Sequence, residues 1–192
     1  GKPYSLDEIG DVHLRMGEYD SALYYLTNSL YEGRRISAHQ PLTSIKELQP
    51  KTFSKIAKAY LYKGDYEKSF TYYDSTYTIH QLTGNKFGIA EVELGRGAVF
   101  LKQGKFDEAM HYTERAVSLA QEINARILEI ACYNQLSFLW EKKGDYKKSL
   151  EYFKQFKVLN DSLFSNEIQQ KVLRDQIRFE TSTRDDQITA LT

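Results

Sequence analysis

The chain has 192 residues, with 26 basic and 26 acidic side chains and a hydrophobic content of 41%. This balance lacks the basic excess that nucleic-acid binding needs, and the hydrophobic content is too high for a disordered chain. The sequence has no run of about 18 apolar residues that could span a membrane. Its single cysteine, Cys132, excludes an internal disulfide and a cysteine metal cluster.

The prolines favour long helices over most of the chain. All three, Pro3, Pro41 and Pro50, lie in the first 50 residues, and the remaining 142 residues contain none. Gly1 stands where an initiator methionine would be, and we interpret it as an expression scar on a fragment of a longer protein.

A seven-residue motif occurs four times, and its glycines are 47, 40 and 40 residues apart. Each glycine is followed at +2 by Tyr or Phe, at +5 by Ala or Ser, at +6 by a large apolar residue and at +8 by tyrosine. The four copies are residues 17–23, 64–70, 104–110 and 144–150. A repeat at this spacing is typical of solenoids, in which each unit buries its apolar face against its neighbours.

The motif predicts a pair of antiparallel helices in each unit. Before each glycine, apolar residues recur three and four positions apart, as in a helix. The glycine then ends that helix, because it adopts the left-handed conformation without a steric penalty. The aromatic at +2 fills the turn, and the small residue at +5 lets two helices approach closely. Positions +5, +6 and +9 continue the buried stripe of the second helix.

This pattern resembles the tetratricopeptide repeat (TPR) in its turn and second helix. The small residue expected seven positions before each glycine is also present, as Gly10, Ala57, Gly97 and Ser137. The period of 40 exceeds the usual length of about 34 residues, so we expect helices that are longer by one to two turns in total. HEAT repeats share the longer period but not this turn. The resemblance implies a right-handed superhelix that binds partners on its concave surface.

The predicted elements form an all-α, TPR-like α-solenoid of four helix pairs over residues 1–160. The first pair, 5–38, is separated from the second by a linker at 40–49, between Pro41 and Pro50. The pairs are 5–38 (helices 5–16 and 19–38), 51–82 (51–63 and 67–82), 86–122 (86–103 and 107–122) and 125–160 (125–143 and 147–160).

A separate last helix is predicted at about 163–189, within a C-terminal segment of residues 161–192. Asp161 or Ser162 is suited to cap its start. Its first half carries apolar residues that we expect to cover the open edge of the fourth pair. These residues are Leu163, Phe164, Ile168 and Val172. Between Phe179 and Ile188 the chain is fully polar, so we expect the part beyond about Glu180 to fray unless a second copy pairs with it.

The C-terminal segment carries a narrower resemblance. The sequence Leu-Asn-Asp-Ser-Leu-Phe at 159–164, Lys-Val at 171–172 and Arg-Phe-Glu-Thr at 178–181 resemble the end of the TPR region in bacterial membrane-bound TPR sensors. In that family the segment leads to a transmembrane helix and then to a histidine kinase core or a LuxR-type regulator. Residues 182–186 are less regular than the family pattern. The resemblance implies a periplasmic sensor whose last helix is a connector toward a membrane or output region.

A candidate ligand site follows from the repeat register. Positions two, six and ten residues before each glycine are expected to lie exposed on the concave surface, with basic residues beside apolar ones. The candidate binding residues are Arg15, Lys58, Tyr62, Leu94, Lys102, Asn134, Phe138 and Lys142. Such a surface suits an extended peptide or an acidic chain end. The alternative is an ordinary solvated face, since the helix dipole favours Lys near helix C-termini in any case.

No constellation in the sequence indicates an enzyme, a cofactor or a metal site. The four histidines lack metal-ligand spacing; we expect His13 to be packed in the structure and His80 and His111 to face solvent. The Gly-Arg-Gly sequence at 95–97 lies within a predicted helix, which favours close packing over phosphate binding. Trp140 is expected in the core of the fourth pair.

The sequence therefore predicts a non-enzymatic recognition module with a protein or peptide partner and possible self-association through the C-terminal helix. The favoured function is the sensor region of a bacterial signal-transduction protein, periplasmic and anchored in the inner membrane. The first alternative is a free-standing TPR adaptor that assembles other proteins, located in the cytoplasm. The second is a TPR regulator of response-regulator proteins, also in the cytoplasm.

Overall fold

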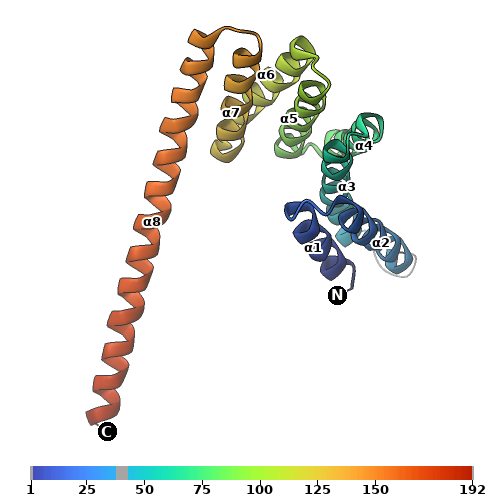
Figure 1. Cartoon of the computed structure of the whole chain (residues 1–192). Coiled ribbons are helices and arrows are strands. Elements are labelled where there is room, and N and C mark those ends of the chain that lie inside the picture. The colour runs from blue at the N-terminus through green and yellow to red at the C-terminus, as the bar shows by residue number, and fades with distance from the viewer. Residues whose placement is uncertain (1, 38–42, 192) are drawn as a thin grey trace.

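The computed structural model describes the backbone of residues 2–37 and 43–191, and it is helical almost throughout (Figure 1). The helices are α1 (Lys2–Arg15), α2 (Tyr19–Ser37), α3 (Thr43–Lys63), α4 (Tyr66–Thr83), α5 (Lys86–Lys102), α6 (Phe106–Glu122), α7 (Arg126–Lys142) and α8 (Tyr146–Leu191). No strand occurs among these residues.

The eight helices pack as four consecutive pairs, which confirms the predicted all-α solenoid. Helices α1 and α2, α3 and α4, α5 and α6, and α7 and α8 form the pairs. The second helix of each pair packs on the first helix of the next, and the first helices also contact one another along the stack. We call α1, α3, α5 and α7 the A helices and the others the B helices. The A helices therefore share one face of the solenoid.

The turn within each pair is set by its glycine, as predicted. Gly17, Gly64, Gly104 and Gly144 all have φ between +75° and +82°, which a side chain would make costly. In the second turn, the amide of Gly64 donates to the carbonyl of Leu61 at 3.1 Å. The next amide, that of Asp65, donates to the carbonyl of Tyr60 at 3.0 Å. These bonds satisfy carbonyls that the end of α3 would otherwise leave without a partner.

Small residues mark the crossing of the two helices in each pair. A Cβ built on Gly10 would lie 2.6 Å from the Leu26 side chain. In the second pair the hydroxyl of Ser69 donates to the carbonyl of Ala57 at 2.8 Å. In the fourth, the hydroxyl of Ser137 donates to the carbonyl of Ser149 at 3.0 Å. The serines thus combine small size with a partner for a buried backbone carbonyl.

The predicted linker at 40–49 is wrong over most of its length. Helix α3 begins at Thr43, and Pro50 is buried inside it. A proline inside a helix removes one backbone hydrogen bond and its ring crowds the preceding turn, at a cost of about 3 kcal/mol. The burial of Pro50 and the packing of α3 on α2, α4 and α5 offset that cost, so the helix continues through it. Residues 38–42 lie outside the described part of the chain.

The separate C-terminal helix is also wrong. Helix α8 runs without a break from Tyr146 to Leu191 and contains neither glycine nor proline to stop it. At 1.5 Å per residue it is about 69 Å long, against about 26 Å for α7. Asp161 and Ser162 therefore lie inside a helix, and Lys157 pairs with Asp161 across one turn at 3.4 Å.

The continuous helix also overturns the predicted cap. Leu163 and Phe164 lie on the helix that they were expected to cover, and Phe164 is exposed. Ile168 and Val172 have side chains outside the described set. Among the other described helices, α8 packs on α7. The distal part of α8 projects away from the solenoid (Figure 1). The backbone is helical beyond Glu180, where fraying was predicted.

Candidate ligand groove

Two adjoining cavities lie along the A helices. The first, of about 470 Å³, is formed by α1, the start of α2 and α3. The second, of about 380 Å³, is formed chiefly by α3, α5 and α7. Lys58 and Tyr62 line both, so we treat the two cavities as one groove with these residues at its centre.

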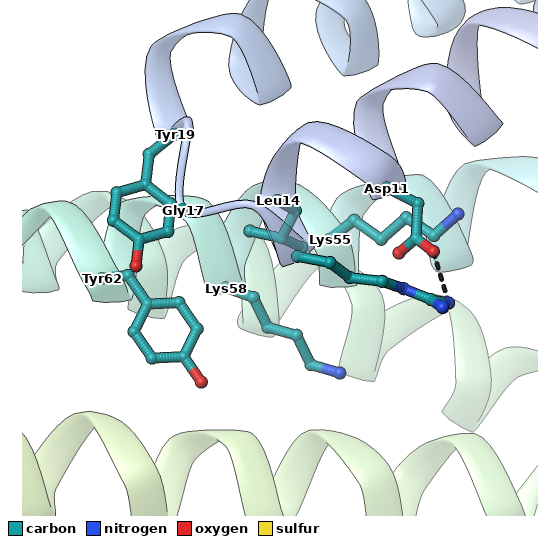
Figure 2. Close-up of a pocket in the computed structure, with 8 residues that line it drawn as sticks. Asp11, Leu14, Gly17, Tyr19, Lys55, Lys58 and Tyr62 are labelled. Carbon is teal, nitrogen blue, oxygen red and sulfur yellow. Dashed lines mark ion pairs between the residues drawn. The ribbon is translucent and has the colours of Figure 1, made fainter.

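The first cavity contains charged groups that are mostly paired (Figure 2). Arg15 forms an ion pair with Asp11 at 2.6 Å. Lys55 forms an ion pair with the buried carboxylate of Asp7. Lys58 has no ion pair among the residues that the structure describes, and its ammonium group extends into the cavity (Figure 2). Among the described residues that line the first cavity, Lys58 is thus the cation without a directly paired carboxylate.

An aromatic pair forms one wall of the first cavity. The rings of Tyr19 and Tyr62 stack with centroids 5.5 Å apart and an interplanar angle of 16°. Tyr19 follows the first turn glycine by two positions, and Tyr62 precedes the second by two. The half-buried Tyr19 holds the exposed ring of Tyr62 in place. A stacked pair of this kind offers a rigid surface to a ligand at small cost in side-chain entropy.

The second cavity has an apolar floor. Its lining includes Leu94, Ala98, Ile127 and Ala131, of which Ile127 is strongly exposed. Gly95 also lines this cavity, and it has no space for a side chain because a Cβ built there would lie 2.4 Å from the buried Tyr73 ring. This part of the groove can accept a hydrophobic side chain.

Polar groups at the edge of the second cavity are partly engaged already. Gln135 donates to the hydroxyl of Thr113 at 2.8 Å. Burial raises the pKa of the Glu91 carboxyl, while the positive charges of Lys58 and Lys51 oppose that rise. Glu91 and Lys58 therefore influence each other across the groove without a direct ion pair.

The structure brings four of the eight candidate residues together. Arg15, Lys58 and Tyr62 line the first cavity, and Leu94 joins the latter two in the second. The other four candidates line neither cavity and are exposed on α5 and α7: Lys102, Asn134, Phe138 and Lys142.

Two of those four interact with each other. The ammonium of Lys142 lies 4.9 Å from the Phe138 ring centroid, a cation–π contact on the surface of α7. Asp7, which occupies the same register in α1, was expected to be exposed. It is instead buried, and it accepts a 2.7 Å hydrogen bond from the hydroxyl of Thr52.

Sequence reasoning missed several residues of the groove. Tyr19 was assigned only to the turn, although its place two residues after the glycine is the signal that could have found it. Ile127 and Glu91 carried no signal, because their contribution depends on how three helices converge.

The packing of His13 agrees with the prediction, whereas the burial of His80 does not. His13 is packed as expected, with its ring stacked on Tyr25 at 5.1 Å and its Nδ1 2.6 Å from the Glu18 carboxylate. His80 was expected to face solvent and is buried instead. Its ring occupies the space left by Gly88, where an added Cβ would lie 2.4 Å from the ring. Burial lowers the pKa of His80.

A charge cluster lies apart from the groove, between α4, α5 and α6. The carboxylate of Glu93 is fully buried and lies 3.1 Å from Arg115 and 3.7 Å from Arg96. Arg96 also pairs with Asp74 and stacks over Tyr77 at 4.3 Å. Burial raises the pKa of Glu93, and the two arginines oppose the rise. Both oxygens of the Glu93 carboxylate and the Nε of Arg96 are buried without a hydrogen-bond partner among the described residues, so the ion pairs balance the charges of this cluster and do not saturate its hydrogen-bonding groups. We interpret the cluster as packing between neighbouring pairs, because its side chains come from α4, α5 and α6.

The described residues contain no group of three or more metal-ligating side chains in a suitable arrangement. Cys132 is fully buried, and burial raises the pKa of its thiol to about 12, so it is not a reactive nucleophile. Within the same part of the chain, no helix combines the length and apolar character that crossing a bilayer requires.

These features define an α-solenoid of helix pairs, a class of protein-interaction module. Residues 48–122 match the tetratricopeptide repeat family, so the TPR assignment made from the turn motif is supported. No curated protein matches the sequence.

Similar solved structures agree with this fold. The TPR domain of Arabidopsis FLU has a TM-score of 0.56 at 18% identity, covering 61% of this chain and 98% of that one. Aspartyl phosphate phosphatase F from Bacillus subtilis has a TM-score of 0.73 at 15% identity, covering 84% of this chain and 41% of that one. The apo form of RapI has a TM-score of 0.70 at 14% identity, covering 85% and 57%. The chain thus spans about half the length of the latter two, and at these identities the likeness concerns the fold alone.

Proposed function

We propose that this chain is a non-enzymatic recognition module that binds an extended protein segment in the groove between α1, α3, α5 and α7. The observation that carries the proposal is the unpaired ammonium of Lys58 at the junction of the two cavities. An acidic side chain or a terminal carboxylate of the partner pairs with it. A neighbouring apolar side chain of the partner then fills the floor formed by Leu94, Ala98 and Ile127.

The chemistry of the groove supports an acidic, extended ligand over a neutral one. Arg15 and Lys55 are already paired with carboxylates, whereas Lys58 interacts with Glu91 only at longer range, so its ammonium is available to a ligand. A partner carboxylate here gains a charge-assisted contact in a partly desolvated site, where such a contact is stronger than in open water. The rigid Tyr19–Tyr62 pair lies beside it and offers area for a peptide backbone.

The test is a screen of peptides with internal or C-terminal acidic residues, followed by titration of the best binder. Lys58→Glu should weaken binding by about tenfold, because an attractive charge contact with the partner carboxylate is replaced by repulsion. Lys102→Glu is the matched control, since Lys102 is also a basic residue of an A helix but lies outside the groove. Equal effects of the two variants would reject the groove and leave only non-specific attraction.

The wider role that we propose is the sensor region of a bacterial signal-transduction protein, periplasmic and anchored in the inner membrane. Support comes from the resemblance of residues 159–164 and 178–181 to membrane-bound TPR sensors. The continuous course of α8 adds to it, because a rigid helix that leaves the last repeat is suited to transmit a change. In this role α8 would associate in parallel with a second copy, helped by the high local concentration that anchoring creates.

Two measurements test this role: the gene sequence that encodes residues beyond 192, and the hydrogen exchange of the chain fused to a dimeric coiled coil. An apolar segment of about 20 residues should follow if the chain is anchored. Fusing a dimeric coiled coil after residue 191 should then increase hydrogen-exchange protection of residues 180–191. A downstream sequence without such a segment would reject the sensor role.

A free-standing adaptor fits the fold equally well. It uses the same groove, so the peptide test does not separate the two roles, whereas the downstream sequence does.

A further inference from the structure

The three junctions between consecutive helix pairs share one register. Counting from the turn glycines, a residue at a given distance before the glycine of an A helix faces the residue at the same distance after the glycine of the preceding B helix. The evidence is four contacts at distances of two, nine and sixteen residues. They are Tyr62 with Tyr19, Gly95 with Tyr73, Gln135 with Thr113, and Gly88 with His80.

On the A helices, positions five and eight before the glycine are buried at every junction. In α3, α5 and α7 all six side chains at these positions are at most 8% exposed. They are Ile56, Ala59, Arg96, Val99, Leu136 and Leu139. In α1 the same positions hold Ile9 and Val12, which are 40% and 55% exposed. Helix α1 thus presents an apolar stripe whose counterparts are each covered by a B helix.

The opposite end of the solenoid shows the complementary face. Position nine after the glycine is at most 2% exposed in α2, α4 and α6, where it is Leu26, Tyr73 and Thr113. In α8 it is Phe153, which is 45% exposed, and beside it Leu150 is 52% and Tyr146 is 72% exposed. Because α8 continues as a straight helix, its own distal part cannot fold over this face.

We propose that the uncovered face of α8 in one molecule binds α1 of a second molecule, in the register of the internal junctions. In that register Arg15 is opposite Tyr146 and Glu8 is opposite Phe153. Val12 and Ile9, five and eight residues before their glycine, then face the segment 149–153 of α8, which carries the exposed Leu150 and Phe153. In this arrangement α1 of the second molecule lies on α8 as the next A helix lies on the preceding B helix at the internal junctions. The joint is heterologous, since two different faces meet, so copies add head to tail.

The charges around the two faces favour this occupant over a symmetric pair. The α8 face is bordered by exposed lysines, among them Lys147, Lys154 and Lys157. The α1 face carries the exposed carboxylate of Glu8 nine residues before its glycine, which the shared register places opposite Phe153, the residue that precedes Lys154. Two α8 faces packed on each other would oppose lysine to lysine, which is costly.

The test is the mass of the 192-residue chain in solution as a function of concentration, measured by sedimentation equilibrium. The weight-average mass should rise above 22.3 kDa with concentration, without a plateau at the dimer. Val12→Lys and Phe153→Glu each remove one face, so each variant alone should remain monomeric. Both positions are exposed, and circular dichroism should show unchanged helicity and melting temperature.

Mixing the two variants gives the decisive result. The Val12→Lys chain keeps its α8 face and the Phe153→Glu chain keeps its α1 face, so the mixture should form a one-to-one complex that cannot grow. Val158→Glu is the control on α8, because its position is exposed in all four pairs; this variant should associate like the wild type.

Three outcomes would overturn the proposal. One is a constant monomer mass for the wild type, and another is loss of association in only one of the two single variants, which indicates a symmetric contact. The third is association that survives both variants but disappears when residues 166–192 are deleted, since that places the contact in the distal part of α8.

A gain of affinity provides an independent check. In two internal junctions a lysine one residue before the glycine pairs with an aspartate three residues after the preceding glycine: Lys63 with Asp20, and Lys143 with Asp107. The proposed joint has Met16 and Lys147 at these positions. Met16→Glu should therefore tighten association about two- to fivefold and Met16→Lys should weaken it, whereas equal effects would contradict the register.

Discussion

Gly97 of α5 and Ala109 of α6 meet where these helices cross, and a Cβ built on Gly97 would lie 3.2 Å from the carbonyl oxygen of Ala109. The same Cβ would lie 2.6 Å from the hydroxyl of Thr113. The close approach depends on a missing side chain in one helix and a methyl group in the other. It explains why the repeat places a small residue seven before and five after each turn glycine.

Ala109→Leu should lower the free energy of unfolding by about 1–3 kcal/mol, because Ala109 is fully buried at this crossing. Urea denaturation followed by circular dichroism would measure the change. Ala131→Leu is the matched control, as Ala131 is exposed on α7 and should tolerate the same substitution within about 0.5 kcal/mol. Equal stability of the two variants would mean that the helices separate to admit the larger side chain.

Gly88→Ala should also destabilise the chain, since the new Cβ would lie 2.4 Å from the His80 ring. We expect a loss of about 1–3 kcal/mol in the wild-type background. In a His80→Ala background the clash disappears, and the same substitution should become neutral or stabilise α5 by up to about 1 kcal/mol. A double-mutant cycle from urea denaturation measures this coupling, and additive effects would place the ring elsewhere.

The pH dependence of stability should reveal the buried imidazole. Burial lowers the pKa of His80 in the folded state below its unfolded value of 6.5, so the unfolded chain binds the proton more readily. The contribution of neutral His80 to stability is therefore complete above pH 6.5 and is lost as the pH falls below that value. Thermal melts from pH 7.5 to 5 should show a steeper decline for the wild type than for His80→Gln. Parallel declines would indicate an unshifted histidine.

Deleting residues 166–192 should leave the unfolding free energy unchanged within about 0.5 kcal/mol. Helix α8 packs on α7, which is much shorter, and the distal part of α8 projects beyond the solenoid (Figure 1). Phe156→Ala is the contrasting variant, because Phe156 packs against the core of the fourth pair and should cost about 2–4 kcal/mol. A large loss of unfolding free energy on deletion would show instead that the distal part of α8 covers the fourth pair.

The sequence by itself determined the helix pairs, their turns and their crossings. These features are local: a glycine that adopts positive φ at Gly64 or Gly104, an aromatic two residues later, and a small residue at Ala57 or Ala109 fix one unit each. The four copies reinforced one another, so the α-solenoid followed without knowledge of any long-range contact.

Only the tertiary structure decided the rest. Pro50 lies inside α3, although local rules place a helix boundary there. His80 is buried because Gly88 of the next pair leaves room for its ring, a relation that neither residue signals alone. The groove likewise joins Lys58, Tyr62 and Leu94 while Lys102 and Lys142 remain outside. Burial, charge pairing and cavity shape depend on which residues of different helices meet, and that depends on how the pairs stack.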